Sequence, residues 1–547
     1  MFLFRLEGED SVPDTIQSMA RRAREASFSL AGASLEARNQ ALEAIAREIE
    51  NHMDNLLAVN AADVEAATAE GLSAPLLSRL KLTRAKCAGM AEGLRSLALL
   101  PDPLGKVQYA RELSPGLNLY RVSCPIGVVG VIFESRPDAL VQIASLCLKS
   151  GNAVLLKGGR EAARTNEALA DLIIGAARQC GLPDGWCALL HSREDVQEML
   201  RQHEWIDLII PRGSNAFVRY IMQNSEIPVL GHAEGLCHVY VDDPCDLNLA
   251  LRVTVDSKAQ NLSVCNAAET LLVNAGVASA FLPEVARALR EKGIALRGDE
   301  RTRALIGCDP ATEEDWATEY LDAILSIRVV DSLEEAVAHI NRYGSHHTDC
   351  IITTDRAHAE FFMNRVDSAD VFLNCSTRFA DGFRYGLGAE VGIATGKLHA
   401  RGPMGMEGLC TYKYRLYGSG QTLSQLDSGE IKLTHRPIEP KLPCVSSLRK
   451  QKDSRAGCLP ARVYGAAENP GAVRKRLIYA ARPANDLSPW DTGARKTGII
   501  RPAASGGFRL MEACPPTFSF EIRFADPSPI WPRHAGLSAP EETHVCP

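Results

Sequence analysis

Cys265 is the residue of this sequence whose type and setting best suit nucleophilic chemistry. It lies in a polar stretch just before the apolar run Thr270–Val273, which predicts a β-strand. A thiolate in such a position can attack a carbonyl carbon and form a thioester, which a nicotinamide cofactor can reduce or release. The chain has 16 cysteines, so this interpretation of Cys265 needs a cofactor site elsewhere in the sequence.

Two predicted strand ends offer such a site. The strand Ala153–Leu156 runs into Lys157, two glycines and Arg160, and cations at this edge of a parallel sheet suit an adenine-ribose 2′-phosphate. An exposed basic turn explains the same residues equally well. After the strand Asp207–Pro211, Gly213 and Ser214 open a helix whose N-terminus suits a pyrophosphate. The usual GxGxxG fingerprint is absent, which weakens an ordinary Rossmann interpretation.

The elements that position these residues alternate between strand and helix. Ser34 is a predicted N-cap, followed by an apolar helical stripe that runs to Leu56. Apolar runs of strand length then alternate with helical segments, the pattern of parallel sheets covered by helices. The predicted later strands are Gly127–Phe133, His238–Val241, Ser326–Val330, Asp349–Thr353 and Val371–Asn374. The fold class is therefore α/β with two parallel-sheet domains, and Cys265 lies near their junction.

Composition narrows the class of protein. The net charge of −7 gives no reason to expect nucleic-acid binding, and the longest apolar run, Ile126–Phe133, is too short to span a membrane. The N-terminus does not resemble a signal peptide, so a cytoplasmic protein is predicted. The cysteines and histidines lack the spacing of a disulfide framework or a zinc site, so no metal is predicted.

The chain changes character near residue 420. Residues 422–547 are rich in proline and mix both charges, and no part of them sustains helical or strand periodicity for long. A mostly disordered extension is predicted there. A genuine linker-like tail, a fusion, and out-of-frame or read-through translation would all produce such a change.

Three segments resemble the γ-glutamyl phosphate reductases, also called glutamate-5-semialdehyde dehydrogenases, within the aldehyde dehydrogenase superfamily. Residues 330–351 carry the motif AVAHINRYGSHHTDCI, and residues 123–138 and 398–409 support it. The resemblance covers about residues 14–421. It implies an aldehyde-dehydrogenase-like fold with a small β oligomerisation flap. It also implies NADPH-dependent reduction of L-glutamyl 5-phosphate to glutamate 5-semialdehyde and phosphate, the second step of proline biosynthesis.

Residue by residue, the resemblance makes Cys265 the nucleophile and Lys157 the adenine-ribose contact. It implies that Gly213 and Ser214 bind the pyrophosphate of the cofactor and that Glu319 binds its nicotinamide ribose. It further implies a homo-oligomer in which a hairpin at 107–124 pairs with the strand near 409–416 across subunits, and a functional link to glutamate 5-kinase. No carboxylate stands at the end of the strand 228–232, where hydrolytic members keep the base that activates water.

The substrate contacts are less well defined by the sequence. The substrate's phosphate and α-carboxylate need cations, for which Arg136, Arg384 and Arg401 are candidates, and Asn374 is a candidate for the α-amino group. Ser135 is a candidate oxyanion donor, although a helix N-cap explains it equally well. For the histidine pair His346 and His347, a structural role is favoured over a catalytic one.

One departure from the family pattern lies beside the nucleophile, where Asn261-Leu262 replaces an expected Arg-Pro. This departure and the unusual tail motivate one alternative hypothesis, a catalytically silent scaffold of the same fold. Another acylating semialdehyde dehydrogenase, linked to CoA or phosphate, is a second alternative. The predicted domains are a cofactor domain (1–106 and 125–254), a catalytic domain (255–388), a flap (107–124 and 389–421) and the extension (422–547).

Overall fold

The computed structural model describes residues 15–134, 136–232 and 234–443. Helices open this part of the chain, and the Ser34 hydroxyl caps the second by accepting from Ala37 N–H, as predicted. The apolar stripe predicted as one helix is interrupted at His52, which ends one helix and begins the next. These helices are α1 (Ile16–Ala31), α2 (Leu35–Asn51), α3 (Met53–Ala69), α4 (Ala74–Leu80) and α5 (Arg84–Leu99).

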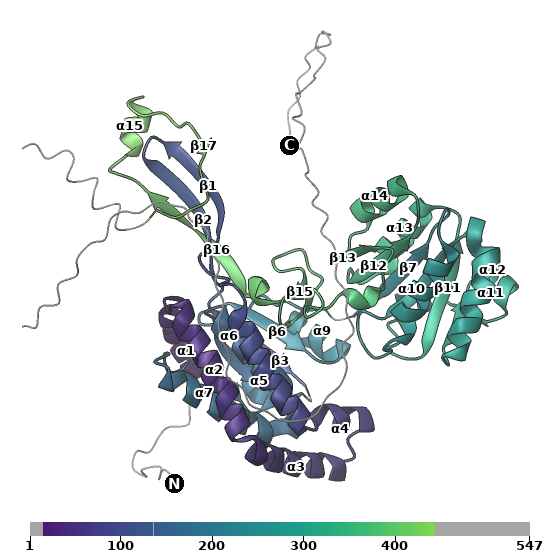
Figure 1. Cartoon of the computed structure of the whole chain (residues 1–547), viewed down its shortest axis with the longest axis horizontal. Coiled ribbons are helices and arrows are strands. Elements are labelled where there is room, and N and C mark those ends of the chain that lie inside the picture. Colours follow the sequence, from purple (N-terminus) through teal and green to yellow (C-terminus); the bar gives the residue numbers. More distant parts are fainter. Residues whose placement is uncertain (1–14, 135, 233, 444–547) are drawn as a thin grey trace, which may run out of the picture. The chain divides into compact units, whose positions relative to one another are not determined.

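The first parallel sheet has the strand order β5-β4-β3-β6. Its strands are almost wholly apolar, as expected for a sheet covered on both faces, and α1, α2 and α5–α7 share one core with it (Figure 1). The elements are β3 (Val128–Phe133), α6 (Pro137–Lys149), β4 (Ala153–Lys157), η1 (Arg160–Ala162), α7 (Ala163–Gln179), β5 (Cys187–Leu190), α8 (Arg193–Met199), β6 (Leu208–Arg212) and α9 (Asn215–Asn224).

The second parallel sheet has the order β10-β9-β11-β8-β7-β12-β13. Its strands are β7 (Cys237–Val241), β8 (Ala268–Asn274), β9 (Ala295–Gly298), β10 (Asp309–Pro310), β11 (Ile324–Val330), β12 (Thr348–Ile352) and β13 (Asp370–Leu373). Its helices are α10 (Leu247–Ala259), α11 (Ala275–Glu291), α12 (Glu300–Ile306), η2 (Asp315–Ala317), α13 (Leu333–Tyr343), α14 (Arg356–Arg365) and η3 (Thr377–Phe379).

Alternating side chains of β7 reach the two faces of this second sheet. Val239 and Val241 pack with α10 and α11, whereas Tyr240 packs with α13 and α14. β7 lies inside this second sheet, between β8 and β12. The predicted boundary at residue 254 is wrong, because periodicity identifies a strand but does not assign it to a sheet.

A third sheet is antiparallel, with the order β16-β2-β1-β17. Its strands are β1 (Val107–Ser114), β2 (Leu117–Pro125), β16 (Cys410–Tyr417) and β17 (Arg436–Pro437). β16 pairs with β2 of the same chain, which corrects the expectation that this pairing crosses subunits. β16 follows η4 (Met406–Leu409), and the Ile126 N–H donates to Leu409 O, so the pairing continues a contact that the same chain makes just before β16.

The structure also corrects the ends of the predicted flap. β14 (Gly392–Ala394) and β15 (Gly402–Met404) pair with each other, and side chains between Val391 and Leu409 join the core of the first domain. Ordered structure continues past residue 421 through α15 (Leu423–Asp427), which a capping box begins, to β17 on the edge of β1. The extension, predicted to be mostly disordered from residue 422, therefore begins with ordered structure up to residue 443, and residues 444–547 lie outside the described part.

A buried ion pair joins α10 to β8. Lys258 Nζ lies 2.6 Å from Glu269 Oε2, and both side chains are buried. Burial raises the pKa of Glu269 to about 7 despite this partner. Glu269 also accepts from Leu321 N–H, 3.1 Å away, so it holds three segments together.

Lys258→Met should lower the free energy of unfolding by roughly 3–5 kcal/mol, because it leaves the Glu269 carboxyl buried without a counter-ion. Urea unfolding followed by circular dichroism measures the loss. The double variant Lys258→Met/Glu269→Gln removes the charge and keeps the acceptor for Leu321, so it should recover most of the lost stability. A double variant as unstable as the single one would contradict this account.

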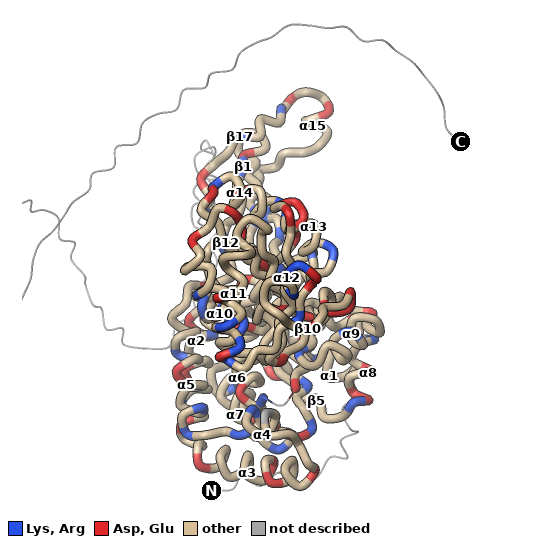
Figure 2. The backbone as a smooth tube through the Cα atoms, turned by 90° about the vertical axis from the view of Figure 1, so that its right-hand side faces the viewer, with Lys and Arg blue, Asp and Glu red and all other residues tan. Residues whose placement is uncertain are grey.

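Charges of both signs alternate along the described backbone (Figure 2). None of the described helices combines the length and the apolar character that a membrane-spanning helix needs.

Candidate active site

Cys265 lies in the turn that leads into β8, and His347 lies directly before β12. Cys265 Sγ and His347 Nε2 are 3.2 Å apart. β8 and β12 both flank β7 and run parallel to it, so residues that precede the two strands meet at the same edge of the sheet. The sequence favours a structural role for His347 over a catalytic one, and the structure adds that its ring contacts the predicted nucleophile.

Burial disfavours the charged form of both groups. Burial raises the pKa of the Cys265 thiol to about 12, and the nearby carboxylates of Glu319 and Glu390 add to this effect. Arg212 acts in the opposite direction. Burial also holds the pKa of His347 well below its usual value. His347 Nδ1 lies 2.8 Å from Thr348 Oγ1, and donation from Nδ1 to this hydroxyl leaves Nε2 free to accept the thiol proton.

A second histidine, His232, lies beside the first. Its ring centroid is 4.9 Å from that of His347, and its Nδ1 lies 2.8 Å from the carbonyl oxygen of Ile393. Burial lowers the pKa of His232. Sequence reasoning examined the end of strand 228–232 only for a carboxylate, so it did not find this residue's proximity to His347.

Two arginines lie close enough to the thiol to interact electrostatically with it. Arg212, at the end of β6, is close enough to Cys265 for each charge to shift the pKa of the other. Arg378 also senses the Cys265 charge, and its Nε donates to Gln260 Oε1 over 2.9 Å. Sequence reasoning named neither arginine. Both are candidates to hold a phosphate, because guanidinium groups bind phosphate oxygens in a bidentate manner.

The predicted substrate residues divide into two groups. Arg384 donates to the carbonyl oxygen of Arg378 over 2.7 Å, so it lies next to one of the two arginines near the thiol. Arg136 lies close enough to Arg212 to lower the pKa of that guanidinium. Arg401 instead pairs with Asp367, 3.2 Å away.

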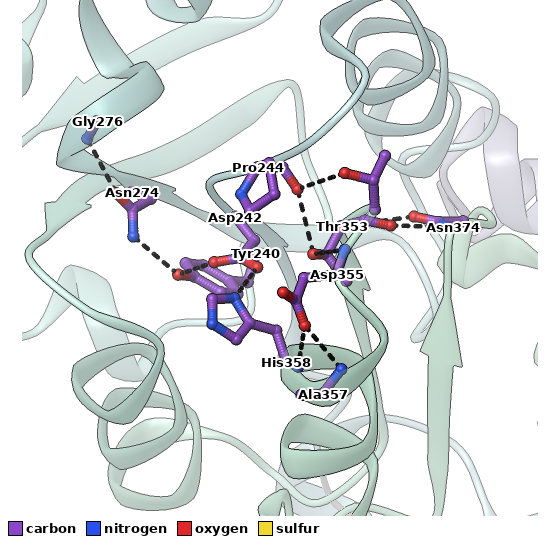
Figure 3. A network of polar contacts seen from close by, with 11 residues as sticks. Tyr240, Asp242, Pro244, Asn274, Gly276, Thr353, Asp355, Ala357, His358 and Asn374 are labelled. Carbon is purple, nitrogen blue, oxygen red and sulfur yellow. Dashed lines mark hydrogen bonds and ion pairs between the residues drawn. The ribbon is translucent and has the colours of Figure 1, made fainter.

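Asn374 does not contact the thiol through its side chain. Its amide oxygen accepts from Thr353 N–H and its amide nitrogen donates to Thr353 O, both over 3.0 Å (Figure 3). Its φ of +58° lies in the left-handed region, which asparagine tolerates, so Asn374 forms a turn after β13. The geometry does not support its prediction as a substrate residue. Ser135 lies outside the described residues.

The expected cofactor residues lie along one edge of the first sheet. Lys157, at the end of β4, is almost fully buried and donates to the carbonyl oxygen of Gly158. Gly213 and Ser214 separate β6 from α9, and Asn215 Nδ2 donates to Glu319 Oε2 over 2.7 Å. This contact brings Glu319 to the same helix N-terminus as the glycine turn.

These residues fit a dinucleotide. A Cβ on Gly213 would lie 2.8 Å from Glu134 Cδ, so glycine lets the Glu134 carboxylate approach the α9 N-terminus, where it accepts from Ser214 N–H. An anionic group therefore suits this turn. Arg160 is exposed and pairs with Glu70, 3.0 Å away, so its phosphate contact stays a prediction.

Comparison with known proteins agrees with this geometry. Residues 7–304 match the model of the aldehyde dehydrogenase family. The γ-glutamyl phosphate reductase of Pelotomaculum thermopropionicum is 56% identical over 424 residues, covering 77% of this chain and 98% of that protein. The protein of the same name from Acetivibrio thermocellus is 54% identical over 429 residues, covering 78% and 100%.

The chain belongs to the γ-glutamyl phosphate reductases of the aldehyde dehydrogenase family. The crystal structure of a γ-glutamyl phosphate reductase from Thermotoga maritima superposes with a TM-score of 0.73 at 38% identity, covering 75% of this chain and all of that one. Family membership confirms the predicted fold class and makes the chain an oxidoreductase.

The departure at 261–262 has a local explanation in this reductase. Asn261 Oδ1 accepts from Ser263 N–H over 3.2 Å, and Leu262 packs against the core of the second domain. Arg378 bonds to the neighbouring Gln260 and is close enough to sense the Cys265 charge. A cation is thus available to the site without an arginine at position 261.

Gly235 lies directly against Cys265, the predicted nucleophile. A Cβ at this position would lie 2.1 Å from the carbonyl oxygen of Cys265 and 2.5 Å from its Cβ. Gly235→Ala should therefore displace Cys265 and lower kcat/KM by about 10²-fold, the effect expected of a misplacement of about 1 Å.

Steady-state kinetics measure this effect, with thermal unfolding to confirm that the variant folds. Gly175→Ala, in a helix with open space around the new Cβ, is a matched control that should keep full activity. Equal activity of both variants would contradict the tight contact.

Proposed function

We propose that the chain reduces γ-glutamyl phosphate to glutamate 5-semialdehyde and phosphate, with Cys265 as the nucleophile. The observation that carries this proposal is the 3.2 Å approach of Cys265 Sγ to His347 Nε2. Such a pair can generate a thiolate on demand in a site where burial otherwise disfavours it. The proposed substrate, γ-glutamyl phosphate, is inferred from the names of the similar proteins.

The first chemical step is an acyl transfer. His347 Nε2 accepts the thiol proton as Sγ attacks the γ-carbonyl carbon, and the electron pair of the carbon–oxygen bond leaves with phosphate. Arg212 and Arg378 supply positive charge for the departing phosphate. The backbone N–H of Cys265 is the proposed donor to the carbonyl oxyanion. The product of this step is a thioester on Cys265.

The cofactor proposed for the second step is NADPH. When bound, it supplies the hydride that converts the acyl group to an aldehyde. Lys157 and Arg160 would hold the 2′-phosphate, the Gly213–Ser214 turn the pyrophosphate, and Glu319 the nicotinamide ribose. His347 would pass the thiol proton to the departing phosphate, which leaves as hydrogen phosphate, and the sulfur is protonated again from solvent as the aldehyde leaves. The first domain thus binds the cofactor and the second binds the substrate.

The cellular setting is also proposed by inference from the family. A cytoplasmic location and a homo-oligomer fit a biosynthetic enzyme of this kind. Glutamate 5-kinase is the proposed functional partner, because an acyl phosphate hydrolyses readily and must be made close to its consumer.

The reverse reaction tests the proposal. Purified full-length chain should reduce NADP⁺ in the presence of glutamate 5-semialdehyde and inorganic phosphate, and it should do so more slowly with NAD⁺. Lys157→Gln should raise the KM for NADP⁺ more than the KM for NAD⁺. Dependence on CoA instead of phosphate would favour a different acylating dehydrogenase. No turnover with either acceptor would favour a catalytically silent scaffold.

A further inference from the structure

Three metal-ligating side chains meet at the amino-terminal edge of the second sheet. His232, Cys265 and His347 each offer one ligand atom, and all three atoms lie within 4.8 Å of one another. Among the residues that the structure describes, these three form a group of His, Cys, Asp or Glu side chains close enough together to share one metal ion. Sequence spacing gave no sign of it, because the three residues come from separate segments of the chain.

Both histidines are oriented as metal ligands usually are. His232 Nδ1 lies 2.8 Å from a carbonyl oxygen, which only accepts, so this nitrogen carries the proton and Nε2 keeps its lone pair. His347 Nδ1 has the Thr348 hydroxyl as its partner, which leaves Nε2 directed at Cys265 Sγ. A hydrogen-bond partner behind each ring is the arrangement that fixes metal-bound imidazoles.

The electrostatics of the site favour a cation over a free thiolate. Burial lowers the pKa of both histidines, so both are in the neutral form that binds metals. Glu319 and Glu390 lie close enough to Cys265 to disfavour a negative charge on sulfur, and the same carboxylates attract a divalent cation. The guanidinium groups of Arg212 and Arg378 also lie close enough to sense the charge on Cys265, and they oppose this attraction in part. A metal ion that coordinates the sulfur would stabilise the thiolate and so offset the free-energy cost of burying its negative charge.

The distances suit a tetrahedral ion after a small movement. Zinc binds sulfur at about 2.3 Å and imidazole nitrogen at about 2.0–2.1 Å, which separates its ligand atoms by about 3.5 Å. Cys265 Sγ and His347 Nε2, at 3.2 Å, already approach this spacing. The widest of the three pairs needs to close by on the order of 1 Å, which side-chain rotation can provide.

We propose that Zn²⁺, or another thiophilic divalent cation, binds to His232, Cys265 and His347 with water as the fourth ligand, and thereby inactivates the enzyme reversibly. Binding releases the thiol proton to solvent and changes no oxidation state. The metal site stands on geometry alone, whereas the loss of activity rests on the proposed role of Cys265.

Cobalt(II) tests the site without reference to activity. Titration of the full chain with Co²⁺ should produce a near-ultraviolet thiolate-to-cobalt band and the intense visible bands of a tetrahedral ion, and one equivalent of Zn²⁺ should remove both. Cys265→Ser should abolish the thiolate band, and His232→Asn and His347→Asn should each weaken binding by at least about 10-fold.

Cys265→Ser retains all the other cysteines of the chain, including those of residues 444–547, so it excludes their thiols as the source of the band. His358→Asn, which alters a histidine bonded to Asp242, should leave the spectrum unchanged. A thiolate band of equal strength in Cys265→Ser, or no band in the unmutated chain, would overturn the site.

Inhibition of the enzyme by Zn²⁺ is the second test of the proposal. Zn²⁺ should suppress phosphate-dependent NADP⁺ reduction, and a chelator should restore the full rate. Cobalt binding without zinc inhibition would overturn the inactivation. A chain with the cobalt spectrum but no turnover before zinc is added would count against the proposed function and leave the metal site standing.

Discussion

Cys265→Ser is expected to lower kcat/KM for phosphate-dependent NADP⁺ reduction by at least about 10³-fold. Serine keeps the size of the side chain and a hydrogen bond to His347, but a hydroxyl is far harder to deprotonate than a thiol. Acid-quenched mass spectrometry should detect a glutamyl adduct on Cys265 of the unmutated enzyme and no adduct in the variant.

Cys245→Ala is the matched control for this experiment. Cys245 is also half-buried, but it follows β7 at the opposite edge of the same sheet and contacts no residue of the site in the described structure. Its replacement should leave the rate unchanged. Phosphate-dependent turnover that persists in Cys265→Ser would overturn the thioester mechanism.

His347→Asn is expected to lower kcat/KM by about 10²-fold or more, the usual contribution of a positioned general base. Asparagine can still bond to Thr348 but cannot take up the thiol proton. The rate at which iodoacetamide alkylates Cys265 should fall in parallel, because this reaction also requires the thiolate. Alkylation reports on thiol activation separately from cofactor binding.

His346→Asn provides a control one residue away. His346 has a φ of +62°, which asparagine tolerates, and its Nδ1 lies 2.6 Å from the carbonyl oxygen of Asp367 rather than near Cys265. Its replacement should leave alkylation of Cys265 unchanged. Equal loss in both variants would mean that His347 acts only through local structure.

Local sequence was enough to locate the parts of the candidate site that lie within one segment. Cys265 before its strand, Lys157 at a strand end and the Gly213–Ser214 turn were all predicted from neighbours in the chain. The structure places each of them at the predicted strand boundary.

Residues that depend on sheet order could not be predicted in this way. His347 meets Cys265 only because β8 and β12 flank the same strand, β7. Arg378 lies near the thiol because the chain turns at Asn374 after β13 and returns to bond with Asn266 and Gln260. Periodicity contains no information on either arrangement.

The same limit explains the domain errors. The apolar pattern of β7 identified a strand correctly, but its partners follow it in the sequence instead of preceding it. β17 has only two residues, too few for any period, and its prediction would have required knowledge that the edge of β1 is open.

The two edges of the second sheet have opposite characters. At the carboxyl-terminal edge, Tyr240 and His358 both bond to Asp242, and Asn374 bonds to Thr353, so polar groups that follow the strands are already satisfied (Figure 3). The reactive thiol lies at the amino-terminal edge. Redesign of the substrate range of this enzyme should therefore vary the segments that precede β7, β8 and β12. Insertions after these strands would break the hydrogen bonds of the carboxyl-terminal edge and would lie away from the thiol.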